Sequence, residues 1–237
     1  MANNDIAPIF DRTRLLIGDE NCQKIASAHV LILGIGGVGG YAVENLARAG
    51  VGKLTLIDGD TVDITNTNRQ LSALAETTGI AKTEVWGNRV KSINPNIQTD
   101  LRQCFLRSQE DIDSLLDNTH FDFAIDAIDE FAPKIAFIFA LKRRKIPFIS
   151  AMGAGGKLDP SQIKIADISK TSGCPLARNV RKTLREHGIS KGIKTVYSPE
   201  PPLKHFADRK IGSISFIPAI FGCFCAAEAI NSLIKKS

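Results

Sequence analysis

Short apolar runs alternate along this chain with segments in which apolar residues recur every three or four positions. A short run that stops at glycine or a polar residue is typical of a buried strand, and the longer spacing is typical of a helix with one buried face. Strands are expected at residues 29–34, 53–58, 96–101, 121–129 and 147–153. Helices are expected ahead of the first strand and at residues 41–50, 82–94, 108–118 and 131–145. This alternation predicts an α/β fold with a doubly wound, Rossmann-like, mostly parallel sheet.

The pattern changes after residue 153. Residues 155–168 are expected to form an extended pair, followed by a basic helix at 175–187. Residues 197–213 are rich in proline and polar side chains, which predicts a loop or crossover near the functional site. Residues 212–236 are expected to close the chain as a strand and an apolar helix.

The chain has 237 residues, which is enough for one large domain. We predict a single domain over residues 1–237. Residues 1–153 would form its nucleotide-binding core, and residues 154–237 a smaller C-terminal extension on the substrate side. With 43% hydrophobic and 23% charged residues, the composition is that of an ordinary globular protein.

Composition and charge narrow the possible partners. No apolar stretch reaches the roughly 18 residues that span a bilayer, and the first residues lack the apolar core of a signal peptide. We therefore expect a cytoplasmic protein with no obligate membrane partner. None of the five cysteines lies in a C-x-x-C pair, so no structural zinc is expected. The net charge of +5 fits an acidic partner such as RNA.

The first predicted strand ends in a glycine-rich turn, LILGIGGVGG. Gly34, Gly36, Gly37 and Gly39 have the spacing that places phosphates on the first turn of a helix. Asp58 ends the next strand, where its carboxylate can accept hydrogen bonds from ribose hydroxyls. This arrangement serves NAD and ATP equally, so it leaves an oxidoreductase and an adenylating enzyme both open.

Charged residues further along distinguish these alternatives. An adenylating enzyme must stabilise the charge that develops on a leaving pyrophosphate, whereas a dehydrogenase keeps its pyrophosphate intact. Arg69 offers a planar fork for phosphate oxygens and Lys82 a compact charge. Asn66 and Asn68 add neutral donors nearby. If they are not simply solvated surface groups, these residues favour ATP.

The residues together resemble a known family. The stretch GIGGVGGYAVENLARAGVGKLTLIDGDTVDITNTNRQ at 34–70, with Lys82 and AIDAID at 124–129, resembles the ubiquitin-activating-enzyme-like superfamily that includes bacterial MoeB, ThiF and HesA. The resemblance implies a nucleotide-binding fold that transfers AMP from ATP to a carboxylate.

The resemblance also assigns roles to residues. The four glycines become the nucleotide loop and Asp58 the ribose ligand, while Asn66, Asn68, Arg69 and Lys82 fall on phosphate-binding positions. Asp129 falls on a position associated with Mg²⁺. Arg12, in FDRTRLLIG, matches an arginine that a neighbouring subunit supplies in trans, which implies a homodimer. Asp126 is expected to be structural. Asp60 is a weaker candidate than the other residues for a role at the nucleotide site.

Two later segments indicate a branch of this superfamily. KTSGCPLAR at 170–178 and GSISFIP at 212–218 resemble the tRNA threonylcarbamoyladenosine dehydratases. The implied reaction is adenylation of the threonyl carboxylate of threonylcarbamoyladenosine in tRNA, followed by ring closure with net loss of water. The alternative is adenylation of the C-terminus of a ubiquitin-like or sulfur-carrier protein, which the missing zinc cysteines disfavour.

A basic stripe fits an RNA substrate. Arg178, Arg181, Lys182 and Arg185 share one face of the helix expected at 175–187, and such a stripe can track a phosphate backbone. A second basic cluster lies at 142–145. Both sets can also be explained as solvated helix faces, and the second as favoured by the helix dipole.

Cys174 stands just before a proline that can start a helix. A helix N-terminus lowers a thiol pKa, and related enzymes use a cysteine nucleophile. Ring closure within the substrate needs no protein nucleophile, so we favour a structural role for Cys174 and keep the nucleophile as the alternative. The sequence leaves open whether a monovalent cation or a sulfur-transfer protein takes part.

Overall fold

Seven strands form one sheet in the computed structural model, which describes residues 8–203 and 211–235. The strands are β1 (His29–Leu33), β2 (Lys53–Ile57), β3 (Gln98–Arg102), β4 (Phe123–Asp126), β5 (Phe148–Ala151), β6 (Lys164–Asp167) and β7 (Lys194–Tyr197). Their order is β3-β2-β1-β4-β5-β7-β6. All neighbouring pairs are parallel except β6 and β7. The mostly parallel α/β fold predicted from the sequence is confirmed.

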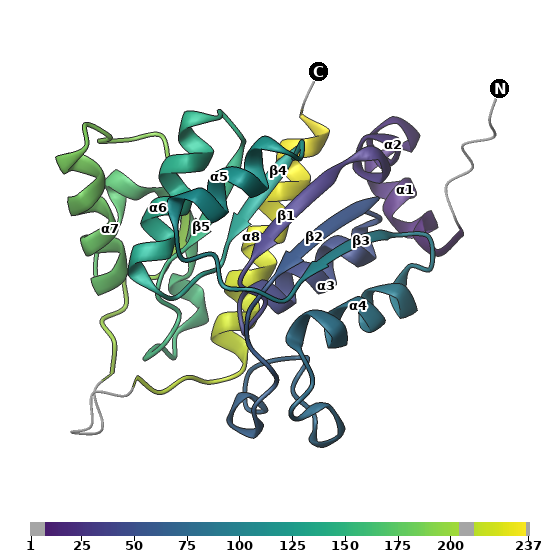
Figure 1. Ribbon diagram of the computed structural model, residues 1–237, viewed down its shortest axis with the longest axis horizontal. Helices are drawn as coiled ribbons and strands as arrows, with labels where there is room; N and C mark the ends of the chain where they lie inside the picture. Colours follow the sequence, from purple (N-terminus) through teal and green to yellow (C-terminus); the bar gives the residue numbers. More distant parts are fainter. Residues whose placement is uncertain (1–7, 204–210, 236–237) are drawn as a thin grey trace.

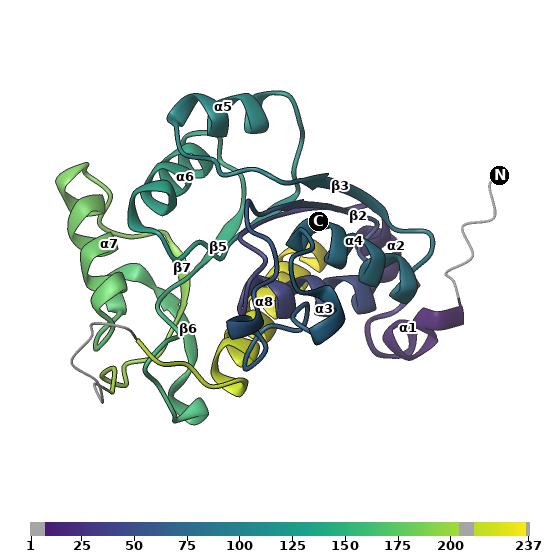
Figure 2. The ribbon, with the colours of Figure 1, turned by 60° about the horizontal axis from the view of Figure 1, so that its bottom comes forward.

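Helices cover both faces of the sheet (Figure 1). They are α1 (Asp11–Ile17), α2 (Asp19–Ser27), α3 (Gly39–Ala49), α4 (Lys82–Ile93), α5 (Gln109–Asp117), α6 (Phe131–Arg143), α7 (Pro175–Glu186) and α8 (Phe216–Ile234). Figure 2 shows α5 and α6 on one side of the sheet and α2, α3, α4 and α8 on the other. Two-sided coverage explains why the central strands are almost continuously apolar.

The middle of the sheet defines where a ligand can bind. The strand β1 is buried along its whole length and pairs with β2 on one side and β4 on the other. From β1 the chain first adds β2 and β3 on one side and then β4 and β5 on the other. The loops that follow β1 and β4 therefore lead to helices on opposite faces of the sheet. In open α/β sheets this reversal of direction leaves a crevice at the carboxyl ends of the strands.

The last helix packs closely against α3. A Cβ atom on Gly222 would stand 2.3 Å from the carbonyl oxygen of Val38, so only glycine allows this approach. With 19 residues and a mean hydropathy of 1.7, α8 is also long and apolar enough to cross a membrane, contrary to the expectation that no segment would be. Core helices of soluble proteins meet the same criteria, and α8 packs into the main hydrophobic core through residues such as Phe221 and Leu233.

Two strands of the sequence prediction are wrong. A strand forms at Lys194–Tyr197, where none was predicted, and the expected strand at 212–215 is absent from the described residues. The carbonyl groups of Gly212 and Ser213 instead accept hydrogen bonds from Gly156 N and the Asn68 side chain. The short β7 has no clear pattern of its own, and its pairing with β5 and β6 defines it.

The other corrections concern boundaries. Of the extended pair expected at 155–168, only β6 is a strand. The strand β4 ends at Asp126, so Asp129 lies in the loop beyond it. The loop predicted at 197–213 is described in part, because residues 204–210 lie outside the described residues.

Candidate active site

The glycine-rich turn joins β1 to α3 at the carboxyl edge of the sheet. Gly34 has a φ of 84°, which L side chains rarely adopt, and a Cβ atom there would meet the carbonyl oxygen of Ala127 at 2.8 Å. A Cβ atom on Gly39 would stand 1.8 Å from the Gly34 carbonyl oxygen. The N-cap residue Val38 has no polar side chain. The first turn of α3 therefore offers backbone N–H groups and the positive end of its dipole to a phosphate.

Asp58 follows β2 beside this turn. Its carboxylate accepts hydrogen bonds from Ile35 N at 2.8 Å and Asp60 N at 2.9 Å. Burial raises the pKa of Asp58, although the nearby Lys82 ammonium acts in the opposite direction. The carboxylate is thus fixed in orientation next to the predicted nucleotide loop, as a ribose ligand must be.

Lys82 begins α4 and points toward the same carboxylates. Its ammonium lies 2.7 Å from Asp60 Oδ2 and 3.9 Å from Asp58 Oδ1. The lysine side chain is almost fully buried, and Thr61 pairs with Ala81 in an isolated bridge that holds the start of α4 against this loop. Asp60, the weaker candidate in the sequence analysis, is nearer to Lys82 than Asp58 is.

Arg69 and Gln70 lie against the glycines. A Cβ atom on Gly37 would be 3.5 Å from Arg69 Cγ and 3.2 Å from Pro218 Cβ, and one on Gly36 would be 3.5 Å from Gln70 Nε2. Gln70 is buried, and its side-chain oxygen has no hydrogen-bond partner among the described residues. The sequence showed Gln70 only as the end of the N-x-N-R-Q motif, so its burial beside the loop is new information.

The two asparagines hold this loop together. Asn66 Oδ1 accepts a hydrogen bond from Asp63 N at 3.3 Å. Asn68 donates to the Ser213 carbonyl oxygen at 2.9 Å and accepts from Arg69 Nη1 at 2.8 Å. Through Asn68, the 66–70 segment is therefore joined to the chain just before α8.

A buried ion pair lies behind the end of β4. Lys134 Nζ is 2.8 Å from Asp126 Oδ2, and both side chains are 0% exposed. The Ser150 hydroxyl and Ile128 N also donate to Asp126, at 2.5 Å and 3.2 Å, and Lys134 donates to the Ala151 carbonyl oxygen at 3.0 Å. Asp126 thus ties β4, β5 and α6 together, and Lys134 was not predicted as its partner.

This pair also orients the loop that carries Asp129. Ala127 contacts Gly34 and Gly39, so the exposed Asp129 follows directly from the wall of the glycine turn. Magnesium in nucleotide sites binds to one or two carboxylates and to substrate phosphates, and Asp129 has the side chain that such a site uses. Among residues 8–203 and 211–235, no three His, Cys, Asp or Glu side chains gather as a metal site.

Lys157 and Cys174 lie near the carboxyl ends of β5 and β7. Lys157 is buried there and donates to the carbonyl oxygens of Ser198 at 3.3 Å and Glu200 at 2.5 Å. Burial lowers the pKa of Lys157. Cys174 is also buried, and its Sγ accepts a hydrogen bond from Ala177 N at 3.5 Å. An isolated lysine in a loop carries no sequence signal, so Lys157 was missed.

Comparisons with known proteins agree with this geometry. Residues 10–237 match the ThiF family. The chain belongs to the ThiF family. It is similar to the tRNA threonylcarbamoyladenosine dehydratases of Bacillus subtilis, 38% identical over 95% of this chain and 94% of the relative, and of Haemophilus influenzae, 39% identical over 92% and 90%.

A solved structure is similar over the same length. The Escherichia coli tRNA N6-threonylcarbamoyladenosine dehydratase, TcdA, in complex with AMP, matches with a TM-score of 0.91 and 37% identity, over 96% of this chain and 94% of that one. The same enzyme in complex with ATP matches with a TM-score of 0.90. The ThiF-family nucleotide fold thus extends over nearly the whole chain.

Other predicted residues of this ThiF-family chain lie away from the glycine turn. Arg12 is exposed on α1. Of the basic stripe on α7, Arg178, Lys182 and Arg185 are exposed. Arg181 instead donates hydrogen bonds to the Thr171 carbonyl oxygen at 2.8 Å and to the Thr171 hydroxyl. Its guanidinium thus helps to hold the segment that leads into α7.

We predict that the Asp126–Lys134 pair is strongly coupled. Lys134→Met should lower the free energy of unfolding by about 3–5 kcal/mol, because it leaves a fully buried carboxylate without its cation. In the double variant Asp126→Leu/Lys134→Met, no unpaired charge remains, so the loss should be much smaller than the sum of the two single losses. Urea unfolding at neutral pH measures all three. Additive losses would contradict the coupling.

Proposed function

We propose that this protein catalyses the ATP-dependent dehydration of threonylcarbamoyladenosine in tRNA. The observation that carries this proposal is the position of Lys82 and Arg69 against the glycine turn and Asp58, where cations can meet a triphosphate that is being cleaved. The relatives named as tRNA threonylcarbamoyladenosine dehydratases, which match over more than nine-tenths of the chain, support the choice of substrate.

The reaction would have two steps. An oxygen of the threonyl carboxylate attacks the α-phosphorus of ATP, the bond to the β-phosphate breaks, and pyrophosphate leaves. A nucleophile within the same modification then attacks the activated carbonyl carbon, and AMP leaves with the former carboxylate oxygen. The nucleophile gives up a proton in this step, so the net change in the tRNA, relative to the carboxylic acid, is the loss of one water. ATP is needed because a carboxylate oxygen is otherwise a poor leaving group.

Each residue has a role that its position allows. Backbone N–H groups at the start of α3 bind phosphate, Asp58 binds the ribose hydroxyls, and Lys82 and Arg69 stabilise the charge that develops on pyrophosphate. Asp129 would hold Mg²⁺, which neutralises phosphate charge when it is bound. Ring closure needs no protein nucleophile, so Cys174→Ser should retain activity.

The test uses tRNA that carries threonylcarbamoyladenosine. Incubation with ATP and magnesium should give the cyclic nucleoside, detected by mass spectrometry as the loss of one water. Lys82→Ala should lower kcat by about 100-fold, because one charge that stabilises the transition state is removed. Unchanged tRNA, together with ATP–pyrophosphate exchange that depends on a carrier protein, would point instead to activation of a ubiquitin-like or sulfur-carrier protein.

We also propose that the active protein is a homodimer formed through α1. Leu15 and Leu16 on this helix are 75% and 83% exposed, which is unusual for leucine side chains side by side in one helix. Phe10 packs on Gly50 at the carboxyl end of α3. The glycine turn is at the other end of this 11-residue helix, about 16 Å away, so Arg12 is better placed to serve a partner's nucleotide than its own.

Mixing two inactive variants tests this arrangement. Arg12→Ala and Lys82→Ala should each be nearly inactive alone. After subunit exchange, one site of each mixed dimer combines an intact Lys82 with the partner's intact arginine, so about a quarter of wild-type activity should return. No recovery, although exchange is shown with tagged subunits, would contradict a role for Arg12 in trans.

The exposed members of the α7 stripe are expected to bind tRNA. Charge reversal in Arg178→Glu/Arg185→Glu should weaken tRNA binding by about tenfold or more and make it less sensitive to salt, because phosphate contacts are lost. The affinity for ATP should stay the same. Fluorescence anisotropy with labelled tRNA measures the first, and calorimetry the second. Normal tRNA binding by this variant would show that the stripe is only a solvated helix face.

A further inference from the structure

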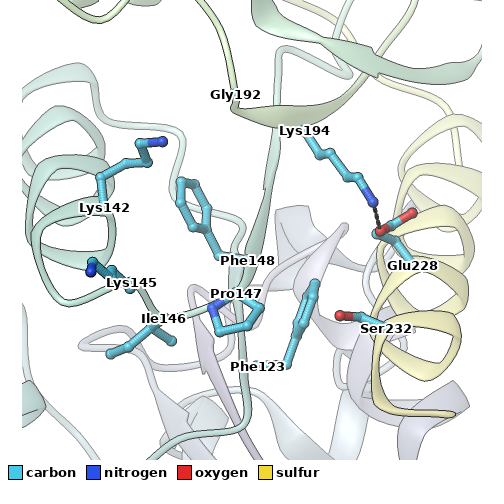
Figure 3. Close-up of a pocket in the computed structure, with 10 residues that line it drawn as sticks. All are labelled: Phe123, Lys142, Lys145, Ile146, Pro147, Phe148, Gly192, Lys194, Glu228 and Ser232. Carbon is cyan, nitrogen blue, oxygen red and sulfur yellow. Dashed lines mark hydrogen bonds and ion pairs between the residues drawn. The ribbon is translucent and has the colours of Figure 1, made fainter. Parts of the chain in front are cut away.

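A pocket of about 330 Å³ opens beside β4, β5 and β7 (Figure 3), at the opposite edge of the sheet from the one that carries the glycine turn. Phe123, Phe148 and Lys194 line it, and these are the first residues of β4, β5 and β7. Because these strands are parallel, their amino ends share one edge. The strands place this pocket more than 10 Å from the nucleotide crevice, by about 3.3 Å per residue. ATP bound at the glycine turn therefore does not occupy it.

Positive charge dominates this pocket. Lys142 and Lys145 come from the end of α6, and Lys194 stands across the phenylalanine rings from them (Figure 3). Glu228 on α8 accepts a hydrogen bond from Lys194 at 2.5 Å. Three ammonium groups and one carboxylate leave an excess of two positive charges.

Lys142, in the last turn of α6, and Lys145, just after this helix, carry this excess. Within the described part of the chain, neither Lys142 nor Lys145 has a carboxylate partner. Their neighbours differ: Arg143 pairs with Asp113 at 2.5 Å, and Arg144 pairs with Asp117 at 2.5 Å. The structure thus neutralises two cations of the 142–145 cluster and leaves the two that line the pocket unneutralised.

The backbone of Lys145 gives a second, independent indication. Its φ of 56° makes it the single non-glycine residue with a positive φ among the described residues. It directly follows the C-cap of α6, where the chain turns back and glycine is strongly favoured. A cation near a helix end also interacts with the helix dipole, but Lys142 and Arg143 already supply that in the last turn. A lysine kept in a strained conformation suggests a use for its side chain.

The basic surface continues toward the stripe on α7. Lys142 also lines a second hollow, with Arg143, Phe139 and His187. His187 caps the carboxyl end of α7, two residues after Arg185. A ligand that lies along this path would meet the pocket, Lys142 and the α7 stripe in succession.

We propose that the pocket binds a backbone phosphate of the RNA substrate, remote from the base that is modified. This inference rests on the proposed function. A ligand that reaches both edges of the sheet must be long. One that contacts Lys142, Lys145, Arg178 and Arg185, which have no acidic partner among the described residues, must be polyanionic; RNA is both. Phosphate contacts of this kind fix the orientation of the nucleic acid and carry no sequence information.

Two single variants test this proposal, Lys142→Ala and Lys145→Gly. Each should weaken the binding of labelled tRNA by about fivefold at 0.15 M salt and lower the slope of log affinity against log salt by about 1, because one phosphate contact is lost. The affinity for ATP should not change. The matched control is Lys24→Ala, which removes the same charge from α2, where Lys24 pairs with Glu20 at 2.9 Å. This control should leave both values near those of the wild type.

Lys145→Gly also separates binding from folding. Glycine relieves the positive φ, so the melting temperature should stay the same or rise while tRNA affinity falls. Wild-type affinity and salt slope in both pocket variants would overturn the proposal, and so would equal weakening in Lys24→Ala. If either result is found and the wild-type protein still dehydrates tRNA, only the pocket proposal fails and the proposed function stands. If the wild-type protein neither binds nor dehydrates tRNA, both proposals fail.

Discussion

The first turn of α3 lies so close to the end of β1 that only glycine fits between them. The Gly39 position faces the Gly34 carbonyl oxygen at a distance where no Cβ atom can stand, and Ala127 closes the other side of Gly34. This close approach sets the start of α3 at the carboxyl edge of the sheet, with its N–H groups pointing toward the crevice. It also brings α3 near enough to α8 that Gly222 must be glycine too. The position of the nucleotide site and the packing of the last helix therefore depend on the same backbone contacts.

Charged groups around this turn differ in what they do. Lys82 reaches Asp60 and Asp58 from a helix that follows the loop, so its ammonium is held between carboxylates beside the glycine turn. Lys134 and Asp126 are completely buried and satisfied by Ser150 and backbone groups, so their charges serve the fold and the loop that carries Asp129. Lys142 and Lys145 form a third kind, since they have no carboxylate partner in the described residues and stand at the other edge of the sheet. Burial and pairing, more than residue type, separate these roles.

Local pattern was sufficient for most of the fold. The strands β1 to β5 and the helices α3 to α8 form close to their expected positions, and most of them have a continuous apolar run or a clear helical spacing. The failures share a cause. The four-residue β7 becomes a strand only through its two neighbours, and residues 212–215 bond to loops that the sequence does not show to be near. Similarly, Lys157 and Lys134 are ordinary lysines in the sequence, and only burial distinguishes them.

The sequence by itself determined the class of fold, the glycine turn, Asp58 and the presence of Arg69 and Lys82, because these depend on spacing along the chain and on the chemistry of single residues. It also carried the resemblance that membership of the ThiF family confirmed. The tertiary structure decided which charges are paired: Lys82 with Asp60, Arg143 and Arg144 with acids on α5, and Lys134 with Asp126. These pairs join residues brought together only when strands and helices pack. A charge that is free and one that is neutralised look the same in a sequence, and only the folded chain distinguishes them.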